Sequence, residues 1–377
     1  MDRAQLNMQG EWPNAIVSLG CLGLLMILVS SLGCHRFGKH IGPQTIMEDR
    51  LPYNNAVADS WKEQTLLNIV KLRYVETPFF LDVPQVISGY SLDHSANASL
   101  GLQNAANVNI PGSERFLGIF GFTTRFSDRP TVSYSPQTSS QFIRNLTTPL
   151  PPIAVLSLLQ SGYSADAVFG LSVQSLNGFR NRSATGGTFH PADPEFLWAI
   201  EALDRAQNNG SFGIRIDRQT ADDETVKIQV GQARGDQLDD ERIWMRELLG
   251  LDVDATEFSV IYGNTPRQPD QIAIKTQPIY MVLRDLSPFV EVPLADLAAG
   301  RALPYDISCV ENPPLIVECG CEPPPDCFVA IPYRDCWFWI DHGHLESKRT
   351  FNFLSVLLAL ADTGPKQAKP TVTIQAN

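Results

Sequence analysis

Positively charged side chains are scarce in this chain of 377 residues. It has 29 Lys and Arg residues against 41 Asp and Glu residues, which gives a formal net charge of −12. Proteins that bind nucleic acids take much of their affinity from basic side chains that neutralise phosphates. The acidic balance, without a basic patch, therefore argues against a nucleic-acid partner.

The short motifs of common catalytic sites are also missing. There is no G-x-S-x-G elbow, no G-x4-G-K-[ST] phosphate loop, no G-x-G-x-x-G and no H-E-x-x-H. An EF-hand pattern is absent too. The acidic cluster 236–241 lies at an expected helix start, where negative charge interacts favourably with the helix dipole, so we interpret it as a helix cap. We therefore expect a non-enzymatic protein without a cofactor.

An apolar run near the N-terminus indicates the cellular location of the protein. It extends from Ala15 to Gly33 without a charged residue. As a helix, at about 1.5 Å per residue, it would nearly span a hydrocarbon core of about 30 Å. The run ends in Ser31-Leu32-Gly33-Cys34, which resembles the lipobox at which a bacterial cysteine is acylated. We therefore expect a signal peptide over 1–33 and a lipid, such as palmitate, on Cys34.

This anchor predicts a lipoprotein of the outer membrane that faces the periplasm. The alternative is an uncleaved signal anchor in the inner membrane. Arg36 and Lys39 follow the run, and the positive-inside rule would then favour a cytoplasmic C-terminus.

Of the seven cysteines, Cys21 and Cys34 lie near the N-terminus and the other five are clustered after a long stretch without cysteine. They are Cys309, Cys319, Cys321, Cys327 and Cys336. The proline-rich loop that holds most of them would gain about 2–4 kcal/mol from each disulfide in an oxidising compartment. Five cysteines allow two disulfides and one free thiol, in a pairing that the sequence does not choose. Zinc is the alternative, although the spacing lacks paired C-x2-C knuckles.

A long β-hairpin is predicted over 96–126. The first strand has apolar residues at nearly every even position from 96 to 110, Pro111-Gly112-Ser113-Glu114 forms a turn, and the return strand repeats the alternation. The larger apolar residues of this hairpin are Leu100, Leu102, Val108, Ile110, Phe116, Phe120, Phe122 and Phe126.

These strands are longer than the usual five or six residues, and two interpretations remain open. The hairpin could span a membrane, which needs about 9–11 residues per strand, with several chains contributing to a shared pore. Alternatively, it is a long, bent hairpin that covers the soluble core or a partner.

The remaining patterns predict an α+β fold. Ser60–Tyr74 has an S-x-x-E capping box and a broad apolar face, as in a first helix. Residues 169–176 resemble a buried strand. From Glu195 onward a hairpin followed by a helix occurs three times. The middle unit has strands at Glu257–Tyr262 and Gln271–Lys275 and a helix near Ile279–Leu286, and the last unit has strands at Phe328–Tyr333 and Cys336–Asp341 before a helix at Glu346–Ala361. This recurring pattern predicts a largely antiparallel sheet with helices on one face.

The expected organisation has four parts after the signal peptide. They are a linker (34–58), an N-terminal domain (59–185) that holds the hairpin, a C-terminal ββα-type domain (193–362) that includes a cysteine-rich loop (301–327), and a tail (363–377).

Five segments carry a family resemblance. They are SWKEQTLLNIVKLRYVETPFFLDV (60–83), DRPTVSYSP (128–136), TTPLPPIAVLSLLQSGYSADAVFGLSVQSLNGF (147–179), TQPIYMVLRDLSPFVEVP (276–293) and DCWFWIDHGHLESKRTFNFLSVLLALAD (335–362). Together they resemble a family of bacterial envelope lipoproteins to which no activity is assigned. The resemblance implies export and lipid anchoring. The cysteine cluster, His342 and His344 depart from it.

One group of residues has the potential to bind a metal ion. Asp341, His342 and His344 leave a predicted strand together, and histidines at i and i+2 can point the same way. Asp341 could orient an imidazole. A third ligand would come from elsewhere, with His94 and His190 as the distant histidines of the mature chain.

The alternative for this segment is a strand-to-helix turn. Asp341, His344 and Glu346 would then accept hydrogen bonds from free backbone N–H groups. Trp337 and Trp339, on the preceding strand, would form either a platform for a sugar or a partner, or part of the core.

These features predict an outer-membrane or periplasmic lipoprotein that acts in assembly, export or pore formation. It would contact the membrane through its lipid and bind copies of itself or other envelope proteins. The alternatives are a metal-dependent envelope hydrolase that uses His342 and His344, and a disulfide-stapled periplasmic binding module.

Overall fold

The computed structural model describes residues 43–87, 90–103, 115–128, 131–136, 140–220, 223–230 and 243–361. The expected signal peptide with Cys34, the hairpin turn, Val108 and Ile110, and the expected tail lie outside the described residues. Within the ranges given above, no helix is long and apolar enough to cross a membrane.

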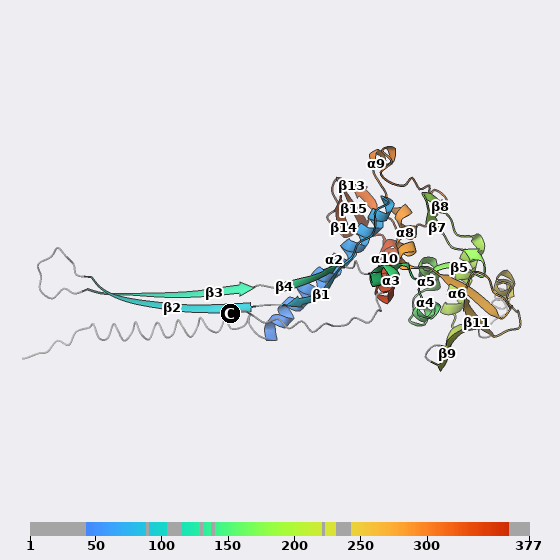
Figure 1. Cartoon of the computed structure of the whole chain (residues 1–377), viewed down its shortest axis with the longest axis horizontal. Coiled ribbons are helices and arrows are strands. Elements are labelled where there is room, and N and C mark those ends of the chain that lie inside the picture. Colours follow the sequence, from blue (N-terminus) through green and yellow to red (C-terminus); the bar gives the residue numbers. More distant parts are fainter. Residues whose placement is uncertain are drawn as a thin grey trace, which may run out of the picture. The chain divides into compact units, whose positions relative to one another are not determined.

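The labelled elements appear in Figure 1. In chain order they are α2 (Pro43–Arg73), β1 (Leu81–Ile87), β2 (Tyr90–Gln103), β3 (Arg115–Asp128), β4 (Thr131–Pro136), α3 (Ser140–Thr147), α4 (Pro152–Gln160), α5 (Ala165–Ser172), β5 (Val173–Leu176), β6 (Phe179–Arg180), β7 (Ser183–Thr185), β8 (Thr188–His190), α6 (Pro194–Asn208), β9 (Phe212–Thr220), β10 (Asp223–Val230), β11 (Glu257–Tyr262), β12 (Gln271–Thr276), α8 (Ile279–Leu286), η2 (Ser287–Phe289), α9 (Leu294–Ala298), β13 (Glu318–Gly320), β14 (Cys327–Tyr333), β15 (Cys336–Asp341) and α10 (Leu345–Ala361). A further helix covers 243–248.

The chain divides into two units. The first combines residues 1–58 with 83–134, and the second combines 59–82 with 135–377. In the first unit, β2 and β3 run antiparallel beside each other (Figure 1). Their pairing continues from Tyr90 opposite Asp128 to Gln103 opposite Arg115 without a register shift. The long hairpin expected from the sequence is therefore confirmed over its described residues.

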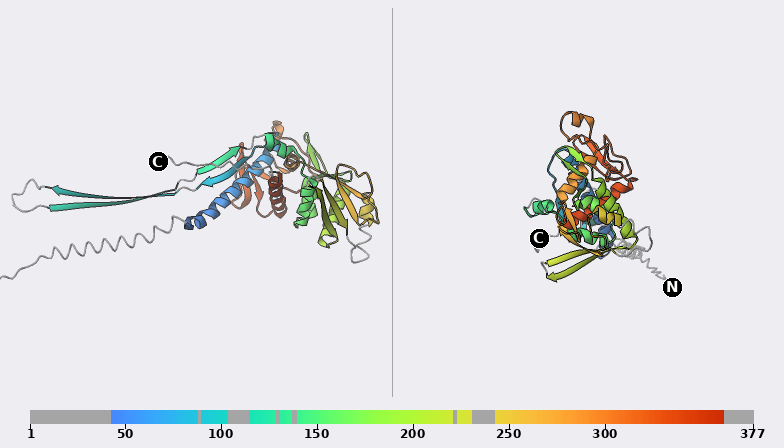
Figure 2. Two further views of the ribbon diagram at one scale, coloured as in Figure 1. Left: turned by 60° about the horizontal axis from the view of Figure 1, so that its bottom comes forward. Right: turned by 90° about the vertical axis from the view of Figure 1, so that its right-hand side faces the viewer.

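A six-stranded sheet lies in the second unit, in the order β6-β5-β12-β11-β10-β9 (Figure 2, left). Its neighbouring strands are antiparallel except β11 and β12, which pair in parallel. Because β5 pairs with β12, the sheet joins segments that the sequence analysis assigned to separate domains.

A second sheet has the order β13-β15-β14, so β15 lies at its centre. Both neighbours pair with β15 in the antiparallel sense. The chain reaches the edge strand β13 through an isolated parallel bridge between Val290 and Val317. Edge strand β13 has only three residues, and therefore little backbone pairing of its own.

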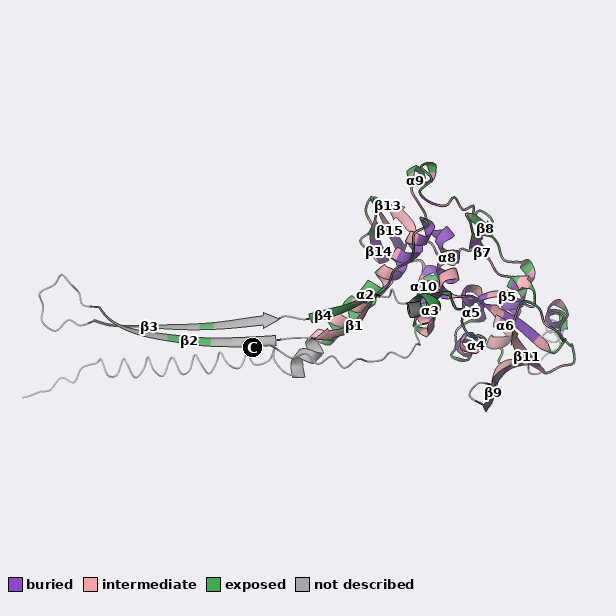
Figure 3. Cartoon of the chain, in the orientation of Figure 1, coloured by how far each residue is buried: buried purple, intermediate pink, exposed green. Residues whose placement is uncertain are grey.

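One apolar core fills the second unit. It joins the C-terminal half of α2 to α5, α6, α8, α10 and both sheets, and Figure 3 shows buried residues on these helices. Burying one large apolar side chain contributes about 1.5–3 kcal/mol to the free energy of unfolding. The aromatic residues that are almost completely buried are Phe169, Phe196, Phe258, Phe338 and Phe351.

The expected α+β fold with a largely antiparallel sheet is confirmed, and three local predictions need correction. Helix α2 begins at Pro43, in keeping with the preference of proline for the first helical turn. Ser60 is therefore inside a helix and caps nothing, and the expected linker is helical from residue 43.

The second correction concerns residues 169–176, expected as one strand. Residues up to Ser172 belong to α5, and the strand begins only at Val173. Ser164 explains the helix, because its side chain caps α5 by accepting a hydrogen bond of 3.4 Å from the Ala167 N–H.

The third correction concerns the middle ββα unit. Its strands β11 and β12 were expected as a hairpin, but they lie parallel, with Ser259 opposite Gln271. Strand pairing of this kind depends on the whole sheet, and side-chain alternation within a strand does not encode it.

Candidate functional site

A cleft of about 260 Å³ lies beside the C-terminal end of β15. Its lining residues are Ile316, Glu318, Asp341, Gly343 and His344. Strand β13 supplies Glu318, Asp341 ends β15, and His344 directly precedes α10. The structure thus brings two of the three candidate metal ligands, Asp341 and His344, to one cleft and adds a second carboxylate to them.

Asp341 and His344 are both held by hydrogen bonds from nearby backbone N–H groups. The Asp341 Oδ1 atom accepts a hydrogen bond of 2.6 Å from the Gly343 N–H. The His344 Nδ1 atom accepts one of 3.1 Å from the Ser347 N–H, in the first turn of α10. A Cβ atom at Gly343 would lie only 3.0 Å from Asp341 Oδ1, so this tight turn favours glycine.

The other two residues of the predicted turn behave differently. His342 is exposed, and its backbone oxygen accepts a hydrogen bond of 3.2 Å from Lys348 Nζ. Glu346 forms an exposed ion pair of 2.6 Å with Arg349, and no backbone hydrogen bond to its carboxylate is seen among the described residues. The expectation of a cap from Glu346 was therefore wrong, whereas Asp341 and His344 do bind backbone N–H groups.

The sequence analysis missed Glu318. Its Oε2 atom accepts a hydrogen bond of 2.8 Å from Trp339 Nε1. Trp339 itself is only 8% exposed, so it belongs to the core and offers no open platform. A buried indole N–H group needs a hydrogen-bond acceptor. A tryptophan expected in the core was therefore the only sequence signal for a partner such as Glu318.

The cleft offers little for metal or ligand binding. The described part of the chain contains no group of three or more His, Cys, Asp and Glu side chains placed to bind a metal ion. His190, on β8, is exposed and does not line the cleft. Ligand pockets usually enclose about 300–1,000 Å³, so a cleft of about 260 Å³ falls below that range.

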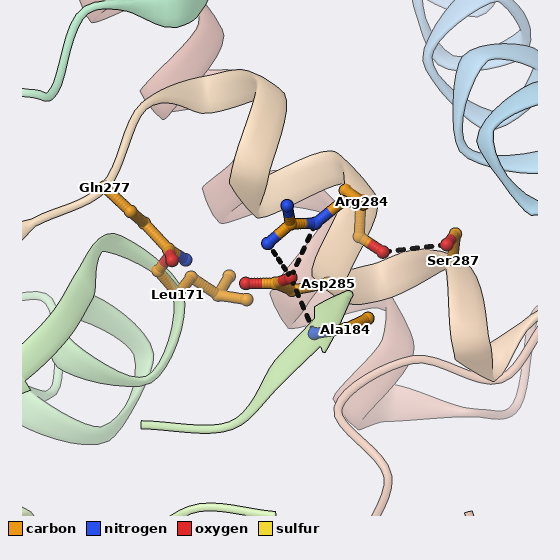
Figure 4. Close-up of polar contacts among 6 residues, drawn as sticks. All are labelled: Leu171, Ala184, Gln277, Arg284, Asp285 and Ser287. Atoms are coloured by element: carbon orange, nitrogen blue, oxygen red, sulfur yellow. Dashed lines mark hydrogen bonds and ion pairs between the residues drawn. The ribbon is translucent and has the colours of Figure 1, made fainter. Parts of the chain in front are cut away.

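A buried polar cluster lies on α8, within one of the five resembling segments (Figure 4). Asp285 is 4% exposed. Its Oδ1 atom accepts hydrogen bonds from the Ala184 N–H at 3.0 Å and from Arg284 Nη2 at 3.1 Å. The Ser287 hydroxyl donates a hydrogen bond of 2.7 Å to the Arg284 carbonyl. The cluster therefore fastens β7 to α8.

Burial makes Asp285 a weaker acid than usual. Removal from water raises the pKa of this carboxyl, against the opposing effects of the Ala184 N–H and Arg284. Its Oδ2 atom has no hydrogen-bond partner among the described residues. Raised carboxyl pKa values occur at catalytic sites, but the contacts of Asp285 lie within the packed interior and serve to join elements.

A second polar network joins the end of α2 to α9. The Tyr74 hydroxyl donates a hydrogen bond of 2.6 Å to Asp296 Oδ2, and Arg301 Nε donates one of 2.7 Å to Asp296 Oδ1. The hydrogen bond from Tyr74 and the Arg301 charge hold the pKa of Asp296 below its usual value. This network positions the loop that leads to β13.

The five clustered cysteines are free thiols in the structure. Cys309 and Cys321 are exposed, whereas Cys319, Cys327 and Cys336 are half-buried. Burial, with a smaller effect from Glu291, raises the pKa of the Cys319 thiol to about 11. A thiol with so high a pKa is a poor nucleophile at neutral pH.

In the hairpin, the register places even-numbered positions of both strands on one face and odd-numbered positions on the other. The odd positions of β2 hold only small or polar residues, and the register places Asp93 opposite Arg125. Opposite charges at directly paired positions favour this register. The even pairs between 92 and 102 are Leu92–Phe126, His94–Thr124, Ala96–Phe122, Ala98–Phe120, Leu100–Gly118 and Leu102–Phe116.

Two tryptophans form an exposed apolar pair that the sequence analysis did not identify. Trp198 on α6 is 46% exposed and Trp244 on helix 243–248 is 42% exposed. Their ring centroids lie 6.0 Å apart. Leu197 and Ile243, the preceding residues, are exposed as well. Contiguous apolar surface of this kind marks interaction sites more often than isolated exposed residues do.

Comparisons of the chain with protein-family models, curated proteins and solved structures give no match. Its function is therefore argued from its own residues.

Proposed function

We propose that this protein is a non-enzymatic lipoprotein of the bacterial cell envelope whose hairpin β2–β3 enters a lipid bilayer as part of a multi-subunit pore or export assembly. The observation that carries the proposal is the length and unbroken register of the hairpin.

The length suits a bilayer. Each strand has fourteen described residues. At about 3.4 Å per residue and a tilt of about 45°, such a strand extends about 48 Å and rises about 34 Å. Hydrocarbon cores are about 30 Å thick, so the hairpin is long enough to cross one, whereas a strand of five or six residues is too short.

The two faces of the hairpin also differ as the proposal requires. From Ala96 to Leu102 the even positions of β2 are apolar, and their partners on β3 are phenylalanines or glycine. The odd positions of β2 are small or polar. A strand that faces lipid on one side and water on the other needs this alternation. The odd positions of β3 include the apolar Leu117 and Ile119, so a pore built in this way would take the polar side chains of its water-filled side mainly from β2.

One hairpin does not enclose a pore, so the proposal requires several copies of the chain. The exposed pair Trp198 and Trp244 supports a second copy as the occupant of that surface, because aromatic residues are enriched in protein interfaces. Replacing both with serine should weaken self-association in sedimentation experiments, whereas replacing the buried Phe196 should unfold the protein.

The lipid on Cys34 would hold the protein at the membrane before insertion. Stable anchoring usually takes two signals, and the lipid and the hairpin would supply them. The two anchors are separable by mutation, which gives the proposal its test.

The test compares four proteins in a Gram-negative host. They are the wild type, Cys34→Ala with residues 1–33 replaced by a signal peptide that is cleaved without lipidation, a variant in which residues 96–122 are replaced by Asn-Gly, and a protein that combines both changes. The replacement leaves Ser95 opposite Thr123, their native partners, across a two-residue turn that hairpins favour. Inner-membrane, outer-membrane and periplasmic fractions are separated, and mass spectrometry detects acylation of Cys34.

The proposal predicts acylated wild type in the outer membrane, retention of Cys34→Ala there, and release of the combined variant into the periplasm. Complete release of Cys34→Ala would contradict insertion of the hairpin and favour a periplasmic binding role. Unacylated wild type in the inner membrane would instead favour the signal anchor.

A further inference from the structure

The edge strand β13 ends one residue before a cysteine, and the central strand β15 begins with one. Their ladder pairs Cys319 with Phe338 and Gly320 with Trp337. Cys321 lies in the bend that follows β13, and the same register extended by one step would place it opposite Cys336.

This placement suits a covalent link. Residues directly opposite each other in antiparallel strands have Cα atoms about 4.5–5.5 Å apart, and disulfides join Cα atoms about 4.4–6.8 Å apart. We propose that Cys321 and Cys336 are a disulfide-forming pair that fastens β13 to β15. The proposal does not depend on where the protein resides.

The other described cysteines lack such a partner in the ladder. Cys319 lies opposite Phe338, which is fully buried. Cys327 pairs with Asp341, at the other end of β15. Cys309 is exposed in the loop before β13. Among these five cysteines, the sheet therefore selects one pair.

The different exposure of the two cysteines indicates which thiol reacts first with an oxidant. Cys321 is exposed, whereas Cys336 is half-buried. Burial, Asp296 and Cys321 raise the pKa of the Cys336 thiol. The Cys321 thiolate would attack a small disulfide, R–S–S–R, to form a mixed disulfide and release one R–SH. The Cys336 thiolate then attacks the Cys321 sulfur and releases the second R–SH. Two protons and two electrons pass from the protein to the oxidant.

Fastening β13 would also fix one wall of the cleft. Glu318 lies on this three-residue edge strand opposite Trp339, and its side chain adds one hydrogen bond to the Trp339 indole. A link at Cys321 would restrain the same strand from its other end. The oxidised protein should therefore hold Glu318 against Asp341 and His344 more firmly than the reduced protein does.

The test uses the purified full chain, first reduced and then incubated with oxidised glutathione. Remaining thiols are blocked with N-ethylmaleimide, and the protein is digested without reduction for mass spectrometry. We expect one major cross-linked product, Cys321 to Cys336, with Cys309, Cys319 and Cys327 blocked. A Cys309→Ser variant is the matched control and should form the same link.

A second measurement follows hydrogen exchange in residues 318–320. Oxidation should slow their exchange at least about tenfold in the wild type, and should have no such effect in Cys321→Ser. The proposal is overturned if Cys321 and Cys336 are both blocked after oxidation, if Cys319 or Cys309 takes the dominant link, or if exchange is unchanged.

Discussion

The Nδ1 atom of His344 accepts a hydrogen bond of 3.1 Å from the backbone N–H of Ser347. The ring therefore caps α10, with His344 directly before the helix and Ser347 at its third position. Ser347 also accepts a hydrogen bond of 2.8 Å at its hydroxyl from the Ile316 N–H. This contact ties the start of α10 to the strand segment that leads into β13.

A capping histidine predicts a specific mutational result. His344→Ala should lower the free energy of unfolding by about 1 kcal/mol, because the Ser347 N–H loses its acceptor. His344→Asn should retain most of the stability, since asparagine is a good cap. His342→Ala, the matched control, should change stability little, because the His342 side chain is exposed. Chemical denaturation measures all three.

The same variants test the hydrolase alternative. If Asp341, His342 and His344 held a metal ion, His342→Ala would lower the bound metal content measured by elemental analysis. Unchanged metal content together with the loss of stability in His344→Ala alone supports the capping role.

The raised pKa of Asp285 predicts that the free energy of unfolding depends on pH. Its pKa is raised in the folded protein, so its protonated form is favoured by folding. The corresponding stability is fully present below the unfolded pKa of about 3.9 and is lost as the pH rises through the folded pKa. Asp285→Asn, which stays neutral, should therefore gain stability relative to the wild type between acidic and neutral pH.

The control for this experiment is Asp285→Ala. It removes the acceptor used by the Ala184 N–H and Arg284. It should lower the free energy of unfolding by about 2–4 kcal/mol at acidic pH, and by less toward neutral pH, where the wild type itself has lost stability. Urea denaturation from pH 3.5 to 7 measures both variants. A wild type that gains stability over Asp285→Asn as the pH rises would contradict the raised pKa.

The backbone conformation of Val75 indicates that a substitution there would stabilise the protein. Val75 follows the end of α2 with φ of 61°, and its side chain is exposed. A left-handed backbone is strained for a β-branched residue. Val75→Gly should raise the free energy of unfolding by about 0.5–1 kcal/mol. Val75→Ala should gain less, because it keeps a Cβ atom; equal gains in both variants would rule out backbone strain as the cause.

Local sequence patterns predicted individual elements well. Helix α8 and strand β15 have the bounds expected from the sequence, because apolar periodicity and turn residues act over a few positions. The hairpin was predicted for the same reason. Patterns of this kind were less reliable at α2, where Ser60 and Glu63 match the capping-box sequence but lie inside a helix that begins at Pro43.

Long-range arrangement was not predictable in this way. The parallel pairing of β11 with β12 and the place of β5 beside β12 depend on how the whole sheet packs. Glu318 joins Asp341 and His344 only because β13 pairs with β15 after a long proline-rich loop. Periodicity within a segment carries no information about that pairing.

The hairpin is proposed to enter a bilayer through its even-numbered face. A liposome experiment tests this with purified Cys34→Ala protein that lacks residues 1–33, and therefore lacks both the lipid and the apolar run, and measures dye release from phospholipid liposomes. Two further substitutions in this background, Ala98→Arg and Ser99→Arg, place the same charge at neighbouring positions on opposite faces of β2.

An arginine facing lipid near the middle of a bilayer costs about 2–4 kcal/mol. If the even-numbered face enters the bilayer, the Cys34→Ala protein releases dye, Ala98→Arg abolishes release and Ser99→Arg preserves it. Equal behaviour of the two arginine variants, or no release by the parent protein, would contradict entry through that face.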